Sequence, residues 1–296
     1  MFEEGQLYSP VTQSASGAVT VHLGAGHPGF QDAVYRERRN EIAASALAWE
    51  RGTVPAPVPY TDAENEVWRL VTAELAAKHE RYAVREFLDA KTAVALPEDR
   101  VPQLFEVTER LAPLTGWAYH PAPGLVGLRE FYGSLADCVF HSTQYVRHPS
   151  QPLYTPEPDI IHEVMGHANM LGSPRFAALK QAAGEATTRV ETDAALQAIA
   201  DVFWFSLEFG VLWEDGELRA YGAGILSSYG EIEEFRTMEI RPLDIAEMTT
   251  VDYDITSYQP VLFGAASFGE LEEVVGGFFE SVDDDTPERI GMSVAA

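Results

Sequence analysis

Hydrophobic positions recur with a helical period along much of the chain. The stretch from Gln31 to Gly52 follows this period, and Gly52 with the prolines after it marks the end of a helix. A second stretch, 61–83, opens with Thr61 and Glu64 at the spacing of a capping box. One mostly apolar helical face there consists of Val67, Leu70, Val71, Glu74 and Leu75. Two long amphipathic helices are therefore predicted near the start of the chain.

Shorter helical patterns follow these two. Ser173 followed by Pro174 has the chemistry of a helix start, because proline is favoured at the first helical position. A helix-like pattern returns after residue 267, although it contains the pair Gly276–Gly277, and glycine is unfavourable inside a helix. The other helices are predicted at 84–93, 102–112, 128–137, 173–184 and 192–211.

Strand patterns are few. The segment 211–222 predicts a hairpin that turns at Asp215–Gly216, and 258–267 predicts a short strand. The expected fold is mainly α, with a few short β-hairpin strands. The expected organisation is a flexible N-terminal arm over 1–26, a single domain over 27–281 and an acidic C-terminal tail over 282–296.

Composition narrows the class of protein. The chain has 296 residues and a net charge of −26, which argues against nucleic acid and anionic membrane surfaces as partners. No apolar run approaches the roughly 20 residues of a membrane helix. The single cysteine, Cys138, allows no internal disulfide, and no secretory signal is visible at the N-terminus. We expect a cytoplasmic protein.

The strongest chemical motif is PDIIHEVMGHANML, residues 158–171. It places His162 and His167 five positions apart, with Glu163 beside the first histidine. Zinc proteases instead place two histidines four apart on one helical face. On a regular α-helix a step of five residues rotates by roughly 140°. We therefore expect the helix to bend or stop at Gly166, so that both imidazoles reach one ion.

A carboxylate stands in a second apolar segment, DVFWFSLEFGVLW. Glu208 lies among aromatic and aliphatic residues, and a buried carboxylate requires a partner or a metal. Two histidines and one carboxylate form the facial triad of non-haem Fe(II) oxygenases. A solvent-facing Glu208, or a Glu208 paired with arginine, stays an alternative on these grounds.

Four longer motifs carry a family resemblance. They are HPGFQDAVYRERR, FHSTQYVRHPSQPLYTPEPDIIHEVMGH, FWFSLEFG and AYGAGILSSYGE, in that order. The sequence resembles the pterin-dependent aromatic amino acid hydroxylases from about residue 27 to 281. The resemblance implies a helical basket around a non-haem iron, with Fe(II) and a tetrahydropterin as cofactors and O2 as co-substrate. It also implies that His162, His167 and Glu208 are the iron ligands.

The resemblance assigns further site residues. Arg147 matches the residue that pairs with the substrate carboxylate, which suits the planar fork of a guanidinium. Glu163 and Trp204 are the candidate catalytic residues. The amino acid is expected to contact Arg147, Thr155, Pro158, Trp204 and Ser227. The pterin is expected to contact Leu125, Val126, Phe131 and Glu163. Asp159 is expected to orient a ligand histidine or to cap its helix.

Several alternatives for function stay open. Trp204 resembles the phenylalanine and tyrosine enzymes, so we expect phenylalanine to be converted to tyrosine. Hydroxylation at the meta position, or of tyrosine or tryptophan, is the alternative within the family. A zinc-dependent hydrolase with Glu163 as general base is an alternative of another class, and a non-catalytic metal- or pterin-binding protein is a third. No sustained heptads follow Ser281, which predicts a monomer.

Overall fold

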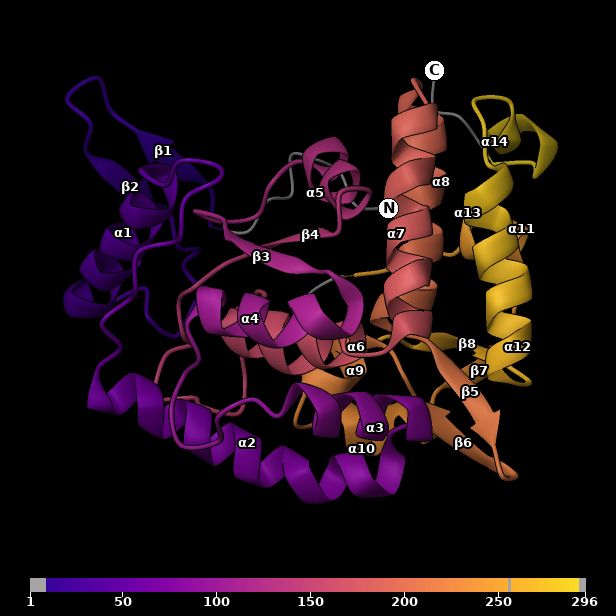
Figure 1. Ribbon diagram of the computed structural model, residues 1–296, viewed down its shortest axis with the longest axis horizontal. Coiled ribbons are helices and arrows are strands. Elements are labelled where there is room, and N and C mark those ends of the chain that lie inside the picture. Colours follow the sequence, from indigo (N-terminus) through magenta and orange to yellow (C-terminus); the bar gives the residue numbers. More distant parts are fainter. Residues whose placement is uncertain (1–8, 255–256, 293–296) are drawn as a thin grey trace.

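The computed structural model describes residues 9–254 and 257–292. Most of this chain is helical, as predicted (Figure 1). The longer helices are α1 (Ala33–Leu47), α2 (Asp62–Tyr82), α3 (Arg85–Val94), α4 (Leu104–Thr115), α5 (Leu128–Leu135), α7 (Pro174–Arg189) and α8 (Asp193–Phe203). The short ones are α6 (Asn169–Leu171), α9 (Ala223–Ser227), α10 (Glu231–Glu234), α11 (Ile245–Met248), α12 (Phe268–Leu271), α13 (Gly277–Ser281) and α14 (Thr286–Arg289).

Three segments are π-helices, and one turn is a 3₁₀-helix. The π-helices are His162–Ala168, Trp204–Glu208 and Glu272–Gly276, and the 3₁₀-turn is Phe235–Thr237. Each π-helix is continuous with an α-helix, and two of them carry the predicted metal ligands. π-Helical turns are rare in proteins, and those that do occur are often found at functional sites.

The helix boundaries follow the predicted capping chemistry. Thr61 Oγ1 accepts a hydrogen bond from the Glu64 N–H at 3.2 Å, and the Glu64 carboxylate accepts one from the Thr61 N–H at 2.7 Å. The capping box at the start of α2 is therefore confirmed. Ser173 caps α7, whose first residue is Pro174.

The strands form three small sheets. An antiparallel pair joins β1 (Val11–Gln13) and β2 (Val19–Val21), and a parallel pair joins β3 (Ala118–Pro121) and β4 (Val139–Ser142). The four-stranded sheet has the order β6-β5-β8-β7. Its members are β5 (Val211–Glu214), β6 (Glu217–Ala220), β7 (Glu239–Pro242) and β8 (Val261–Ala265).

The predicted hairpin is confirmed by β5 and β6. Asp215 and Gly216 have φ values of 53° and 79°, the left-handed pair that a tight hairpin turn requires. In contrast, β8 pairs parallel to both β5 and β7, and β3–β4 is parallel as well. These strands are not hairpin strands, so the strand content was only partly anticipated.

The described part of the predicted N-terminal arm contains the β1–β2 hairpin. Val21 and Leu23 pack against Ala43 of α1 in a small apolar cluster. The boundaries at residues 27 and 281 stay a prediction.

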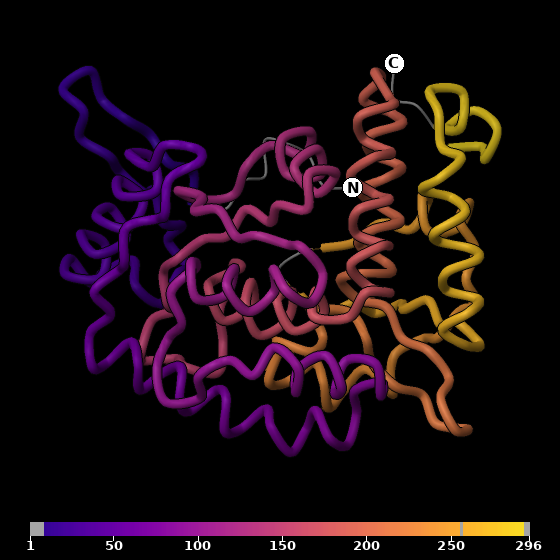
Figure 2. The backbone as a smooth tube through the Cα atoms, viewed as in Figure 1, coloured from indigo at the N-terminus to yellow at the C-terminus, as the bar shows by residue number. Residues whose placement is uncertain are grey.

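One large hydrophobic cluster fills the centre of the molecule. In Figure 1, α7 and α8 stand upright beside α12 and α13, while α2 and α3 run along the bottom. Figure 2 traces the backbone from the indigo N-terminal part at one side to the yellow C-terminal part at the other. The two segments that carry the predicted metal ligands are about 40 residues apart in sequence, and their side chains are in contact. Among the described residues, no helix is long and apolar enough to cross a membrane.

Candidate metal centre and substrate cavity

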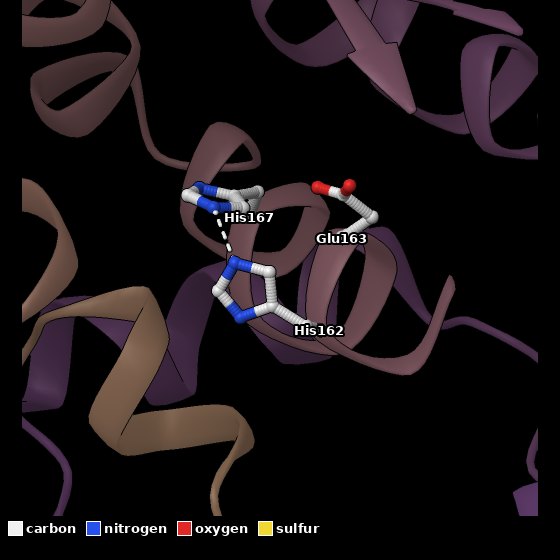
Figure 3. A group of neighbouring side chains, drawn as sticks. All are labelled: His162, Glu163 and His167. Carbon is white, nitrogen blue, oxygen red and sulfur yellow. Dashed lines mark hydrogen bonds between the residues drawn. The ribbon is translucent and has the colours of Figure 1, made fainter. Parts of the chain in front are cut away.

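The two motif histidines lie on one face of the π-helix His162–Ala168. Hydrogen bonds from residue i to i+5 bring side chains five apart above one another. The Nε2 atoms of His162 and His167 are 3.1 Å apart (Figure 3). The expectation that the helix bends or stops at Gly166 was wrong, because the helix widens and continues to Leu171. Gly166 instead allows close packing, since a Cβ there would lie 2.8 Å from the Ala223 carbonyl oxygen.

Glu208 completes the cluster from the π-helix Trp204–Glu208. Its Oε1 lies 3.1 Å from His167 Nε2, and its Oε2 lies 3.7 Å from His162 Nε2. Metal–ligand bonds of roughly 2.1 Å at right angles place neighbouring donor atoms about 3.0 Å apart. The three donors therefore fit one ion, and Glu208 faces neither solvent nor an arginine.

Glu163 is a second carboxylate near the histidines. It offers an oxygen within 4.8 Å of the donor nitrogens, and Figure 3 shows its carboxylate to one side of the histidine pair. Its Oε1 is 3.4 Å from the Thr143 hydroxyl. Burial, and then the charge of Glu208, raise the pKa of Glu163 well above its usual value. Glu208, which contacts both histidines, is thus the better candidate for the ligand.

The protein environment keeps both imidazoles neutral, as metal binding requires. Burial lowers the pKa of His162 to about 4, and burial with the charge of Lys180 lowers that of His167 well below its usual value. Each ring is held through Nδ1, by the Ser227 hydroxyl for His162 and by the Lys180 amino group for His167, both at 2.8 Å. Ser227 donates its own hydrogen to Ala223, so its oxygen can accept the Nδ1–H of His162. Lys180 can accept the Nδ1–H of His167 only as a neutral amine, a form that burial favours by lowering its pKa to about 8. Both Nε2 atoms face Glu208.

Lys180 was not anticipated as part of the site. It lies on α7 and is completely buried, with its amino group 5.0 Å from the centre of the Phe203 ring. Lysine is seldom buried, so the sequence pattern alone favours a solvent-exposed position. The available signal was helical spacing, because Lys180 is four residues from the buried Phe176.

Replacing Lys180 with Met is expected to weaken metal binding. The substitution keeps a long apolar side chain and removes the amine that, in its neutral form, accepts the Nδ1–H of His167 and orients the ring. Loss of such an outer partner typically weakens metal affinity by about 10- to 100-fold. Titration of the metal-free protein with Co(II) measures the change. Lys91→Met is the matched control, because Lys91 bonds His79 Nδ1 at 3.1 Å and none of the three ligands. Equal Co(II) affinity in the wild type and Lys180→Met would contradict the assignment.

A cavity of about 290 Å³ opens beside the metal cluster. All the predicted site residues line it, including those expected near the pterin and those expected near the amino acid. They are Leu125, Val126, Phe131, Arg147, Thr155, Pro158, His162, Glu163, His167, Trp204, Glu208 and Ser227. Their individual roles stay predictions.

Arg147 is held by a carboxylate. Its Nε and Nη2 donate to the two oxygens of Asp159 at 2.9 and 2.8 Å, and both side chains are buried. Asp159 also accepts the His162 N–H at 3.3 Å, which supports the interpretation as a helix cap. Within the described residues Nη1 of Arg147 makes no hydrogen bond, so it can donate to a ligand in the cavity.

Trp204 forms one wall of the cavity. Its indole stacks on Tyr253 with ring centres 4.6 Å apart, and its Nε1 donates to Gln259 Oε1 at 3.3 Å. Neither partner was anticipated from sequence. Both come from the segment after α11, far along the chain, and the contact holds the indole in one orientation.

Two imidazoles and a carboxylate that face an open side of a largely apolar cavity define a mononuclear metal site. This donor set is that of the non-haem iron oxygenases, and it leaves coordination positions open for other ligands.

Comparison with known proteins identifies the family. The sequence model of one protein family, the biopterin-dependent aromatic amino acid hydroxylases, matches residues 13–286 of this chain. The chain therefore belongs to this family of pterin-dependent monooxygenases, and the resemblance seen in the motifs is confirmed.

Individual relatives agree with this assignment. Phenylalanine 3-hydroxylase of Streptomyces coeruleorubidus is 50% identical over 88% of this chain and 93% of its own length. Phenylalanine-4-hydroxylase of Dictyostelium discoideum is 39% identical over 88% of this chain, which spans 60% of that protein. The crystal structure of Chromobacterium violaceum phenylalanine hydroxylase with iron(III) and 7,8-dihydrobiopterin has a TM-score of 0.70 and 28% identity, covering 76% of this chain and 84% of that one. The predicted catalytic-domain fold is confirmed.

Proposed function

We propose that this protein is an iron- and tetrahydropterin-dependent monooxygenase that hydroxylates the aromatic ring of free L-phenylalanine with O2. The observation that carries the proposal is one cavity lined by both the three-donor cluster and Arg147. The cluster suits Fe(II), and Arg147 suits the carboxylate of an amino acid. The names of the relatives support phenylalanine as the substrate.

The chain's own residues position and protect the reaction. His162, His167 and Glu208 would hold the iron, which together with O2 and the pterin supplies the oxidising chemistry that no side chain has. Arg147 would fix one end of the amino acid, so that the aromatic ring lies against Trp204. The apolar walls keep bulk water away from the reacting atoms.

The ring position is the finer part of the proposal. The sequence motifs favoured the para position. The 50% identity to a phenylalanine 3-hydroxylase, against 39% to a phenylalanine-4-hydroxylase, supports the meta position. We propose meta-tyrosine as the main product, with para-tyrosine as the second candidate.

Turnover with product identification tests the proposal. The metal-free protein is loaded with Fe(II) without oxygen, then mixed with O2, a tetrahydropterin and phenylalanine, tyrosine or tryptophan. Meta-tyrosine that forms only with iron and pterin supports it fully, and para-tyrosine corrects only the ring position. Hydroxylation of tyrosine or tryptophan alone would overturn the substrate. If the zinc-loaded protein hydrolysed an ester or an amide and the iron-loaded protein did not hydroxylate phenylalanine, the result would favour the zinc-dependent hydrolase.

The oligomeric state and the cellular compartment stay predictions. We infer a monomer, which sedimentation equilibrium tests directly. The single cysteine suits a reducing compartment such as the cytoplasm. A stable tetramer at micromolar concentration would contradict the first inference.

A further inference from the structure

The acidic residues that line the cavity differ in their partners. They are Glu157, Glu163, Glu208 and Glu231. Glu157 accepts from Arg39 at 2.7 Å, and Glu208 contacts the two histidines. Glu163 shares a hydrogen bond with the Thr143 hydroxyl. Glu231 has no such side-chain partner, and its place in the site is not explained by the metal.

Glu231 is deeply buried and has no positive partner. Its side chain belongs to a residue that is 6% exposed, and its Oε1 accepts one hydrogen bond, from the Gln259 N–H at 3.0 Å. In residues 9–254 and 257–292 it forms no ion pair. Burial raises its pKa to about 7, against the smaller opposing effect of the Gln259 N–H. A buried carboxylate without a counter-charge is unfavourable, so this position suits a cationic ligand group.

Glu231 and Arg147 come from different segments of the chain but line the same cavity. Glu231 is the first residue of α10, four residues after Ser227 at the end of α9. Arg147 comes from the segment between β4 and the π-helix of the histidines. Both line the same cavity. A free α-amino acid carries its carboxylate and its ammonium group on one carbon atom, so it needs an acidic and a basic partner in one pocket.

The hydroxyl groups of Thr155 and Ser227, which also line the cavity, already donate hydrogen bonds to backbone carbonyl oxygens. Thr155 Oγ1 donates to the Glu157 carbonyl oxygen at 2.7 Å. Ser227 Oγ donates to the Ala223 carbonyl oxygen at 2.8 Å, and its contact with His162 Nδ1 serves the metal ligand. Neither hydroxyl carries a charge. An ammonium group in this cavity is therefore best matched by a carboxylate that no protein cation neutralises.

We propose that Glu231 binds the α-ammonium group of the amino-acid substrate and thereby selects α-amino acids over aromatic acids that lack it. The inference rests on the proposed function, in which Arg147 binds the carboxylate of the same molecule. Together the two charges fix the backbone of the amino acid, which leaves the aromatic ring as the end that approaches the metal.

Binding of two ligands that differ only in the ammonium group tests this proposal. L-phenylalanine and 3-phenylpropanoate are titrated into the Fe(II) protein without oxygen and followed by calorimetry. The wild type is expected to prefer phenylalanine. In Glu231→Gln, phenylalanine binding is expected to weaken by about 10- to 100-fold, the usual value of a hydrogen bond to a charged group. Binding of 3-phenylpropanoate is expected to stay equal or to tighten.

Two further variants separate this role from a structural one. Glu231→Asp keeps the charge and is expected to keep the preference for phenylalanine. Glu234→Gln removes the same charge from an exposed position on α10 and is expected to behave as the wild type. Equal weakening of both ligands in Glu231→Gln, or an unchanged preference, would overturn the assignment. A wild type that binds neither ligand would instead refute the proposed function, and the present inference with it.

Discussion

Replacing Glu208 with Ala is expected to abolish tight iron binding and hydroxylation. Glu208 is the only described carboxylate whose oxygens face both His162 Nε2 and His167 Nε2, at 3.7 and 3.1 Å. Without it the site offers two neutral ligands and no negative charge for a dication. The loss of affinity should exceed the roughly 100-fold effect of removing an outer partner. Metal analysis after anaerobic loading and dialysis measures the bound iron.

A variant of the other nearby carboxylate, Glu163, serves as the control for Glu208→Ala. Glu163→Gln removes a charge from a residue that is also close to the histidines, but it leaves the three donor atoms in place. It is expected to keep its iron. The apo form of Glu208→Ala should fold normally, because the substitution removes a buried carboxylate whose own burial is unfavourable. Full iron occupancy in Glu208→Ala, with loss of iron in Glu163→Gln, would exchange the two assignments.

The sequence predicted which residues meet in one cavity, but it did not predict the reasons for their geometry. The long motifs contain most of the residues that were named in advance and that line the cavity, because each motif is a local feature of the chain, whereas Leu125, Val126 and Phe131 lie outside the motifs. The five-residue spacing of His162 and His167 conflicted with an ideal α-helix. The bend or stop expected at Gly166 was wrong because a π-helix resolves the conflict by local widening, which apolar periodicity does not encode.

Contacts between distant segments were the other features that could not be predicted. Lys180 contacts His167 from α7, and Gln259, just before β8, contacts both Trp204 and Glu231. Polar residues at such positions are ordinarily interpreted as exposed, and only the tertiary packing makes them buried partners. The parallel pairs β3–β4 and β5–β8 were missed for the same reason, since the turn chemistry that predicts hairpins does not apply to them.

Replacing Arg147 with Ala is expected to raise the KM for phenylalanine much more than it lowers kcat. Arg147 lines the cavity, and Asp159 accepts from its Nε and Nη2 at 2.9 and 2.8 Å, which leaves Nη1 without a hydrogen bond among the described residues. The guanidinium is therefore held in one orientation, in which we expect it to meet the substrate carboxylate. Truncating one partner of a buried charge pair costs about 2–5 kcal/mol, which corresponds to a roughly 30-fold or larger loss in kcat/KM. Steady-state kinetics with varied phenylalanine measures it.

Asp159, the ion-pair partner of Arg147, allows a test of whether the rise in KM comes from lost substrate contact or from a disturbed fold. In Arg147→Ala the buried Asp159 loses its only ion pair among the described residues, so the melting temperature should fall. The double variant Arg147→Ala/Asp159→Asn removes that unpaired charge and is expected to recover stability without recovering KM. Recovery of both would mean that Arg147 acts by holding Asp159 and the N-terminus of the metal-binding helix. Recovery of stability alone means that the guanidinium meets the substrate, since no other effect of its loss would then remain.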